Sequence, residues 1–106
     1  MRKLALTIWL ASSLMSPNHG RQNDGIWLAN NCAINGGPSD GLCMGYAVGV
    51  AEALISADTI CPAGGLTNRQ VQRVVQKYLS DHSDVHHQPA ILLATAALKQ
   101  AFACRK

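Results

Sequence analysis

The chain has 106 residues, of which 48% are hydrophobic and 14% charged, and a formal net charge of +3 at pH 7. A chain of this length allows one domain, and a domain so small lies near the lower limit that a hydrophobic core alone stabilises. The low and scattered charge argues against a nucleic-acid-binding protein, which needs a basic face that contacts many phosphates.

The N-terminus has the order of features that is typical of an export signal. Two basic residues precede an apolar run over residues 4–10, and Pro17 follows it. This order predicts a signal peptide over residues 1–20 and a mature domain over residues 21–106. The apolar run is shorter than the roughly 20 residues that a spanning helix needs, so we expect no membrane anchor. Loss of the two basic residues would lower the net charge from +3 to +1.

Four helices are expected in chain order, and no segment alternates with the period of two that is typical of a strand. The first follows Asp24, whose side chain is a suitable N-cap, and its apolar residues are Ile26, Trp27 and Leu28. Residues 33–42 are rich in glycine, proline and aspartate, which predicts a loop.

The second helix is expected over residues 42–57 as the central, mostly buried helix of the domain. Gly45 and Gly49 share one face of it. Each glycine costs up to about 1 kcal/mol relative to alanine in a helix interior. A packing role is therefore the favoured interpretation, in which these small residues let another helix approach closely.

The third helix has the clearest amphipathic pattern in the chain. Thr67 and Gln70 have the spacing of a capping box, and the expected core face contains Val71, Val74, Val75, Tyr78 and Leu79, with Gln72 on the opposite face. A fourth helix is expected from Pro89 to about Ala103. Its expected core-facing stripe consists of Ile91, Leu92, Thr95, Leu98 and Phe102.

The four cysteines are Cys32, Cys43, Cys61 and Cys104. An even number of cysteines in a short chain with an export signal predicts disulfides and a location outside the cytoplasm. No two of them have the close spacing of a zinc site, so we expect no metal. The sequence therefore predicts an all-α fold, a small four-helix domain with two disulfides.

The predicted helices also discriminate among the possible pairings. Cys43 and Cys61 lie at opposite ends of the helix over residues 42–57, which spans roughly 24 Å at about 1.5 Å per residue. Bridged Cα atoms lie within about 7 Å, so these two cannot pair. An antiparallel helical hairpin favours Cys32–Cys43 and leaves Cys61–Cys104. The crossed pairing, Cys32–Cys61 with Cys43–Cys104, stays open but requires the hairpin to open.

The polar segment over residues 80–88 contains the candidate site residues His82, Asp84, His86 and His87. A metal or acid–base role is possible for such residues, but adjacent histidines cannot both face one site on a regular helix. A polar loop that binds a partner is the favoured interpretation, because loops carry recognition on rigid scaffolds. No serine or cysteine has the context of a nucleophile. We therefore expect no catalytic residue, no cofactor and no enzymatic activity.

Several short motifs occur in an order that resembles a known family. They are Cys43-Met44-Gly45-Tyr46, Cys61-Pro62, Tyr78-Leu79 with His82, and Ala101-Phe102-Ala103-Cys104. Each motif is weak alone, but their order and spacing are specific. Over residues 25–104 the chain resembles the Rap/Tai family of immunity proteins.

The resemblance implies a periplasmic helical protein that neutralises a peptidoglycan-cleaving amidase toxin of the type VI secretion system. Many members are homodimers, so it also implies a homodimer. Its partner would be the cognate amidase effector, and residues 80–88 would enter the cleft of that toxin. The alternative is a stand-alone periplasmic helical module or an acid-stress chaperone, for which the histidines would allow a response to pH.

Overall fold

The computed structural model describes residues 23–105, and the predicted signal peptide lies outside this range. The elements are α2 (Gly25–Cys32), α3 (Gly37–Ser56), α4 (Asn68–Asp81), the 3-10 helix η1 (Ser83–Val85) and α5 (Ala90–Ala101). Within the described range the only β-type pairing is an isolated bridge between Asp24 and Pro89. The predicted all-α fold with four α-helices is confirmed.

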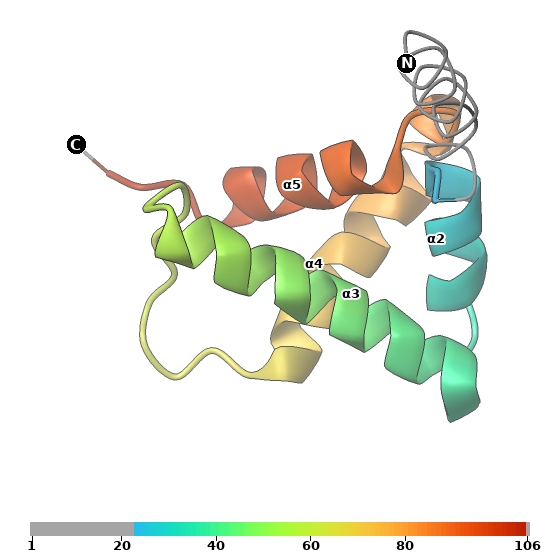
Figure 1. Cartoon of the computed structure of the whole chain (residues 1–106), viewed down its shortest axis with the longest axis horizontal. Helices are drawn as coiled ribbons and strands as arrows, with labels where there is room; N and C mark the ends of the chain where they lie inside the picture. Colours follow the sequence, from blue (N-terminus) through green and yellow to red (C-terminus); the bar gives the residue numbers. More distant parts are fainter. Residues whose placement is uncertain (1–22, 106) are drawn as a thin grey trace, which may run out of the picture.

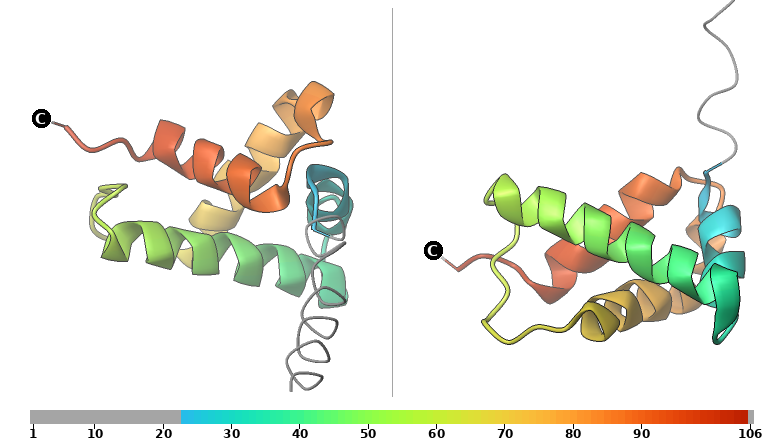
Figure 2. Two further views of the ribbon diagram at one scale, coloured as in Figure 1. Left: turned by 45° about the horizontal axis from the view of Figure 1, so that its top comes forward. Right: turned by 60° about the horizontal axis from the view of Figure 1, so that its bottom comes forward.

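Three of the helices form the body of the domain, and α2 closes one end of it. α3, α4 and α5 pack against one another in pairs, and α4 crosses the other two (Figure 1). α2 lies at the end of the domain where α3 and α5 begin and α4 ends, as the further views in Figure 2 also show. The connection between α3 and α4 runs around the opposite end, next to the end of α5.

α3 begins at Gly37, so the prediction of a loop as far as residue 42 was wrong in its second half. Gly36 and Gly37 have φ angles of 80° and 76°, which glycine adopts without steric cost, and they turn the chain into the helix. Pro38 then stands in the first turn, where a helix needs no N–H from it. Asp40 adds a negative charge at the positive end of the helix dipole.

The buried face of α3 is not the glycine face. Its buried residues are Cys43, Ala47, Val50 and Ala51. Gly45 and Gly49 are exposed, and a Cβ atom added at either would meet no atom within 4 Å. The expected close helix approach at these glycines is therefore absent within the described residues. Short alanine side chains on the buried faces of α3 and α5 allow close packing instead.

Two further predictions about which side chains are buried were wrong. Gln72, placed on the polar face of α4 from the sequence, is fully buried. In α5, Ile91 and Leu92 are 48% and 55% exposed. The buried residues of α5 are Ala90, Leu93, Ala94, Ala97 and Leu98.

The helix caps and the disulfides agree with the predictions. Thr67 accepts a hydrogen bond from the Gln70 main-chain N–H at 3.1 Å, and the Gln70 side chain accepts one from the Thr67 N–H at 2.8 Å. The bonds Cys32–Cys43 and Cys61–Cys104 have Cα–Cα distances of 5.0 and 4.8 Å. The crossed pairing is excluded.

Gly25 is the position at which the fold most needs a glycine. A Cβ atom there would lie 2.7 Å from the main-chain oxygen of His86 and 2.8 Å from its Cα atom. Main-chain atoms cannot move aside as the end of a flexible side chain can. We therefore expect Gly25→Ala to lower the free energy of unfolding in urea by about 1–3 kcal/mol.

Gly64 provides the matched control in the same measurement. It lies outside the helices, and a Cβ atom added there meets nothing within 4 Å. Gly64→Ala should change the stability by less than about 0.5 kcal/mol. Equal stabilities of the two variants would contradict the close contact at Gly25.

Candidate functional site

Two of the four predicted site residues cap the C-terminus of α4. His82 Nδ1 lies 2.8 Å from the carbonyl oxygen of Tyr78, and His86 Nε2 lies 2.7 Å from that of Leu79. A carbonyl oxygen can only accept, so each of these ring nitrogens carries a proton and donates it. The two imidazoles therefore satisfy carbonyl groups that the last turn of a helix leaves without partners.

His82 has a second contact that fixes its ring. The imidazole stacks on the phenol ring of Tyr78, with centroids 4.0 Å apart and an angle of 20° between the planes. His82 and His86 are both half-buried. These contacts give both histidines a role in shaping the chain after α4.

Main-chain hydrogen bonds connect residues 86–90 to the start of α2. The N–H groups of Gly25 and Ile26 donate to the carbonyl oxygens of Gln88 and His86 at 2.8 and 3.1 Å. The N–H of Ala90 donates to the carbonyl oxygen of Asn23 at 2.8 Å. The chain over residues 82–89 is thus ordered by hydrogen bonds, and we call it the recognition ledge because most of it belongs to the segment that the sequence predicts to bind a partner.

The four predicted residues do not converge on one point. His82 lines a depression between α4 and α5, together with Tyr78 and Ala97, whereas His86 lines a different depression between α2 and α4. Asp84 and His87 are exposed on the recognition ledge. Only these last two have side chains that are largely free to contact a partner.

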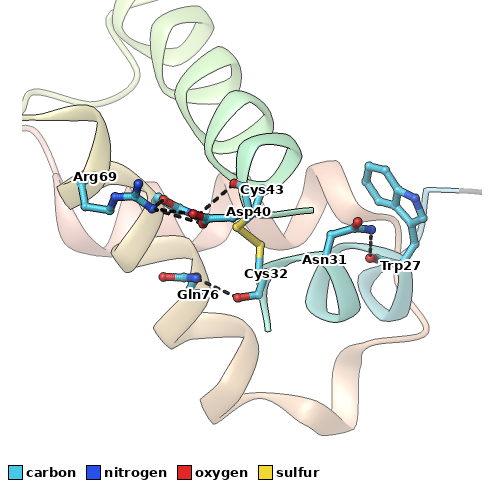
Figure 3. The surroundings of a disulfide bond; sticks show 8 residues. Trp27, Asn31, Cys32, Asp40, Cys43, Arg69 and Gln76 are labelled. Carbon is cyan, nitrogen blue, oxygen red and sulfur yellow. Dashed lines mark hydrogen bonds and ion pairs between the residues drawn. A yellow bond between two sulfur atoms is a disulfide. The ribbon is translucent and has the colours of Figure 1, made fainter. Parts of the chain in front are cut away.

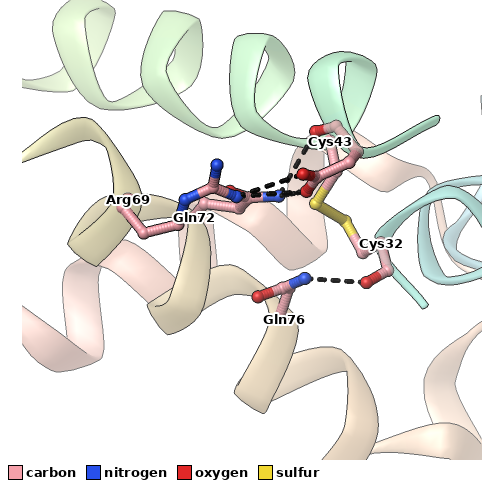
Figure 4. A network of polar contacts seen from close by, with 6 residues as sticks. Cys32, Cys43, Arg69, Gln72 and Gln76 are labelled. Atoms are coloured by element: carbon pink, nitrogen blue, oxygen red, sulfur yellow. Dashed lines mark hydrogen bonds and ion pairs between the residues drawn. A yellow bond between two sulfur atoms is a disulfide. The ribbon is translucent and has the colours of Figure 1, made fainter. Parts of the chain in front are cut away.

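The other end of α2 is fixed at a polar junction with α3 and α4, shown in Figures 3 and 4. The amide nitrogen of the buried Gln72 donates to the Asp40 carboxylate at 2.7 Å, and the Arg69 guanidinium lies 3.2 Å from the same oxygen. The Gln76 amide donates to the Cys32 carbonyl at 2.7 Å, beside the Cys32–Cys43 bond. We call this group of residues the α2–α3–α4 junction.

The junction holds the pKa of the Asp40 carboxyl below its ordinary value of 3.8. The hydrogen bond from Gln72 is the largest cause, and the Arg69 guanidinium acts in the same direction. A lowered pKa in the folded state stabilises the fold at pH values above 3.8, and this stabilisation is lost as the pH falls through the lowered value. The junction is therefore fully formed at neutral and mildly acidic pH.

The solvent side of α3 is a second surface without a partner in the described chain. Along one side of it, exposed positions recur every three or four residues; they are Leu42, Gly45, Gly49, Glu52, Ala53 and Ser56. We call these residues the α3 face. Beside it, Trp27 of α2 packs edge-on against Tyr46, with ring centroids 5.6 Å apart.

The described residues offer few features of other functional classes. Between residues 23 and 105, no helix is both long and apolar enough to cross a bilayer. In the same range, no three histidine, cysteine, aspartate or glutamate side chains gather as they would around a metal ion. The two depressions that the predicted histidines line are surface features beside α4.

No pattern in the sequence indicates the hydrogen bonds that order the recognition ledge, because main-chain groups make most of them. The burial of Gln72 also has no sequence pattern behind it, since a glutamine on a predicted helix is ordinarily exposed. The alternation of charge along α4 placed Gln72 among polar neighbours, and only the position of Asp40 in three dimensions explains its burial.

The capping role of His86 leads to a test of stability. His86→Ala removes the N–H that the Leu79 carbonyl accepts, so we expect the free energy of unfolding to fall by about 1–2 kcal/mol. His87→Ala, one residue on and exposed, should change it by less than about 0.5 kcal/mol. Thermal unfolding followed by circular dichroism checks both, and a larger loss for His87→Ala would contradict the assignment.

Comparison with known proteins agrees with the motif resemblance. The model of the Rap1a immunity protein family matches residues 24–104, which is nearly all of the described chain. No curated protein and no solved structure matches it. The family match favours an immunity role over a stand-alone helical module or an acid-stress chaperone. The chain belongs to the family of Rap1a immunity proteins.

Proposed function

We propose that the protein is a periplasmic immunity protein that binds and inhibits a peptidoglycan amidase toxin delivered by the type VI secretion system. The family match over residues 24–104 is the observation that carries this proposal. Two disulfides in so small a domain fit an oxidising compartment outside the cytoplasm. Export would remove residues 1–20 and leave a mature domain over residues 21–106.

The protein would act without catalysis, by covering the cleft of the toxin with the recognition ledge. His82 and His86 hold the ledge in place through the end of α4, so that Asp84 and His87 present their side chains to the partner. A segment that is ordered before binding loses little conformational entropy when the complex forms. The order of the ledge therefore supports its use as a recognition element.

The test compares effector binding by two double variants of the mature protein. Asp84→Ala with His87→Ala removes two exposed side chains of the ledge and leaves its hydrogen bonds in place. Each lost polar contact costs about 1–2 kcal/mol, so we expect the dissociation constant for the cognate amidase to rise at least about tenfold. Calorimetry and inhibition of peptidoglycan cleavage measure the effect.

The control variant, Arg73→Ala with Lys99→Ala, removes exposed charges from the helices and should bind as the unchanged protein does. Unchanged binding by the ledge variant, together with retained inhibition, would show that the ledge does not contact the toxin. Failure of the unchanged protein to bind or protect against any co-encoded amidase would contradict the immunity role itself.

We also propose that the α3 face joins two copies of the chain in a homodimer. α3 is apolar around most of its circumference, although half of it faces solvent, and a helix of this kind is ordinarily buried. Among the residues of the α3 face, only Glu52 is charged. The glycines of this face, Gly45 and Gly49, would let the backbone of a second copy come close. Such a face suits the symmetric contact of a two-fold dimer, in which the same patch meets itself.

Gly49→Arg tests the dimer at an exposed position where a Cβ atom meets no neighbouring atom within 4 Å, so the substitution should leave the domain intact. We expect sedimentation equilibrium to show a dimer for the unchanged protein and a monomer for Gly49→Arg, with the same circular dichroism spectrum. Gly64→Arg, outside the α3 face, should stay dimeric. A monomeric unchanged protein at micromolar concentration would refute this part of the proposal.

A further inference from the structure

The two disulfides differ sharply in their exposure to solvent. Cys32 is 6% exposed and Cys43 is fully buried, and Cys32 is tied to α4 through its carbonyl oxygen. Cys61 is exposed, and Cys104 is half-buried in the coil that follows α5. Thiol–disulfide exchange requires a thiolate to reach a sulfur atom. The difference in solvent access is therefore enough to make Cys61–Cys104 the more reactive bond.

The chain around the exposed bond is held by other contacts as well. The Cys61 N–H donates to the carbonyl oxygen of Phe102 at 2.8 Å, and the Phe102 N–H donates to that of Leu98 at 2.9 Å. Ile60, next to Cys61, is 2% exposed and belongs to the core. These contacts would keep the two sulfur atoms near each other after the bond between them is broken.

We propose that Cys61–Cys104 is a site of reversible thiol–disulfide exchange with dithiols, whereas Cys32–Cys43 is closed to them in the folded protein. One thiolate of the dithiol attacks the Sγ of Cys61, the more exposed of the two residues, and forms a mixed disulfide. The bond to Cys104 breaks, and its electron pair goes to Cys104 Sγ, which takes a proton from water.

The second thiolate of the dithiol then attacks the mixed disulfide. The dithiol leaves as an oxidised disulfide, and Cys61 leaves as a thiolate that takes up a proton. Two electrons have moved from the dithiol to the protein. The new Cys104 thiol has a hydrogen-bond acceptor nearby, because its sulfur lies 3.9 Å from the carbonyl oxygen of Asp58.

Reduction at this site would change the stability of the domain more than its structure. The bond closes a loop with a sequence separation of 43, and opening that loop gives the unfolded chain more freedom. We expect the singly reduced protein to keep its helices and to unfold at a lower temperature. This inference concerns the end of the domain away from the recognition ledge and does not depend on the immunity role.

The experiment treats the oxidised protein with dithiothreitol under native conditions, blocks free thiols with iodoacetamide at intervals, and locates the label by mass spectrometry. We expect the label on Cys61 and Cys104 to appear at least about tenfold faster than on Cys32 and Cys43. Circular dichroism should stay unchanged while only the first pair is labelled, and oxidised dithiothreitol should restore the bond.

Concentrated guanidinium chloride supplies the control, because unfolding removes the difference in access, and both bonds should then be reduced at similar rates. Three results would overturn the proposal: equal labelling of both pairs in the native protein, loss of helix with the first label, or a rate difference that persists in the denaturant. The double variant Cys61→Ser with Cys104→Ser should fold and keep Cys32–Cys43 resistant, and rapid reduction of that bond in it would also count against the proposal.

Discussion

The Cys32–Cys43 bond is the constraint on which the arrangement of the other elements depends. α2 has 8 residues, well below the about 12–15 residues at which an isolated helix becomes even marginally stable in water. Its position therefore has to come from contacts with the rest of the domain, which are the buried side chain of Leu28 and the attachments at its two ends. The disulfide fixes one end against α3, the Gln76 amide fixes the same end against α4, and main-chain bonds to the recognition ledge fix the other end.

This constraint explains why the domain tolerates a polar group in its core. Gln72 is fully buried, and a buried amide is costly unless its hydrogen-bonding groups have partners. Asp40 and Arg69 supply those partners, and Asp40 stands in the first turn of α3 just before Cys43. The Cys32–Cys43 disulfide and the hydrogen bonds of Asp40 thus both hold the start of α3 in place. Each limits the positions that the groups of the other can take.

The parts of the fold that were predictable from the sequence depend on local chemistry. Thr67 with Gln70, Asp24 at the start of α2, and the disulfide pairing follow from short-range spacing and helix length. Gln72 and Gly25 were not predictable, because their roles come from Asp40 and His86, which are distant in the sequence. In the candidate site, the sequence indicated the segment over residues 80–88. It could not show that two histidines of this segment cap α4 while Asp84 and His87 stay exposed.

The two disulfides lie near opposite ends of α3. At about 1.5 Å per residue, its 20 residues span about 30 Å. The buried disulfide and the recognition ledge lie near the end at which α3 and α5 begin, and the exposed disulfide lies where both helices have ended (Figure 1). The route from Cys61–Cys104 to the ledge runs along α5 and past the depression that His82 lines together with Ala101, three residues before Cys104. The exposed disulfide contributes to stability at one end, whereas the hydrogen bonds that order the ledge, from Gly25, Ile26 and His86, do not involve it.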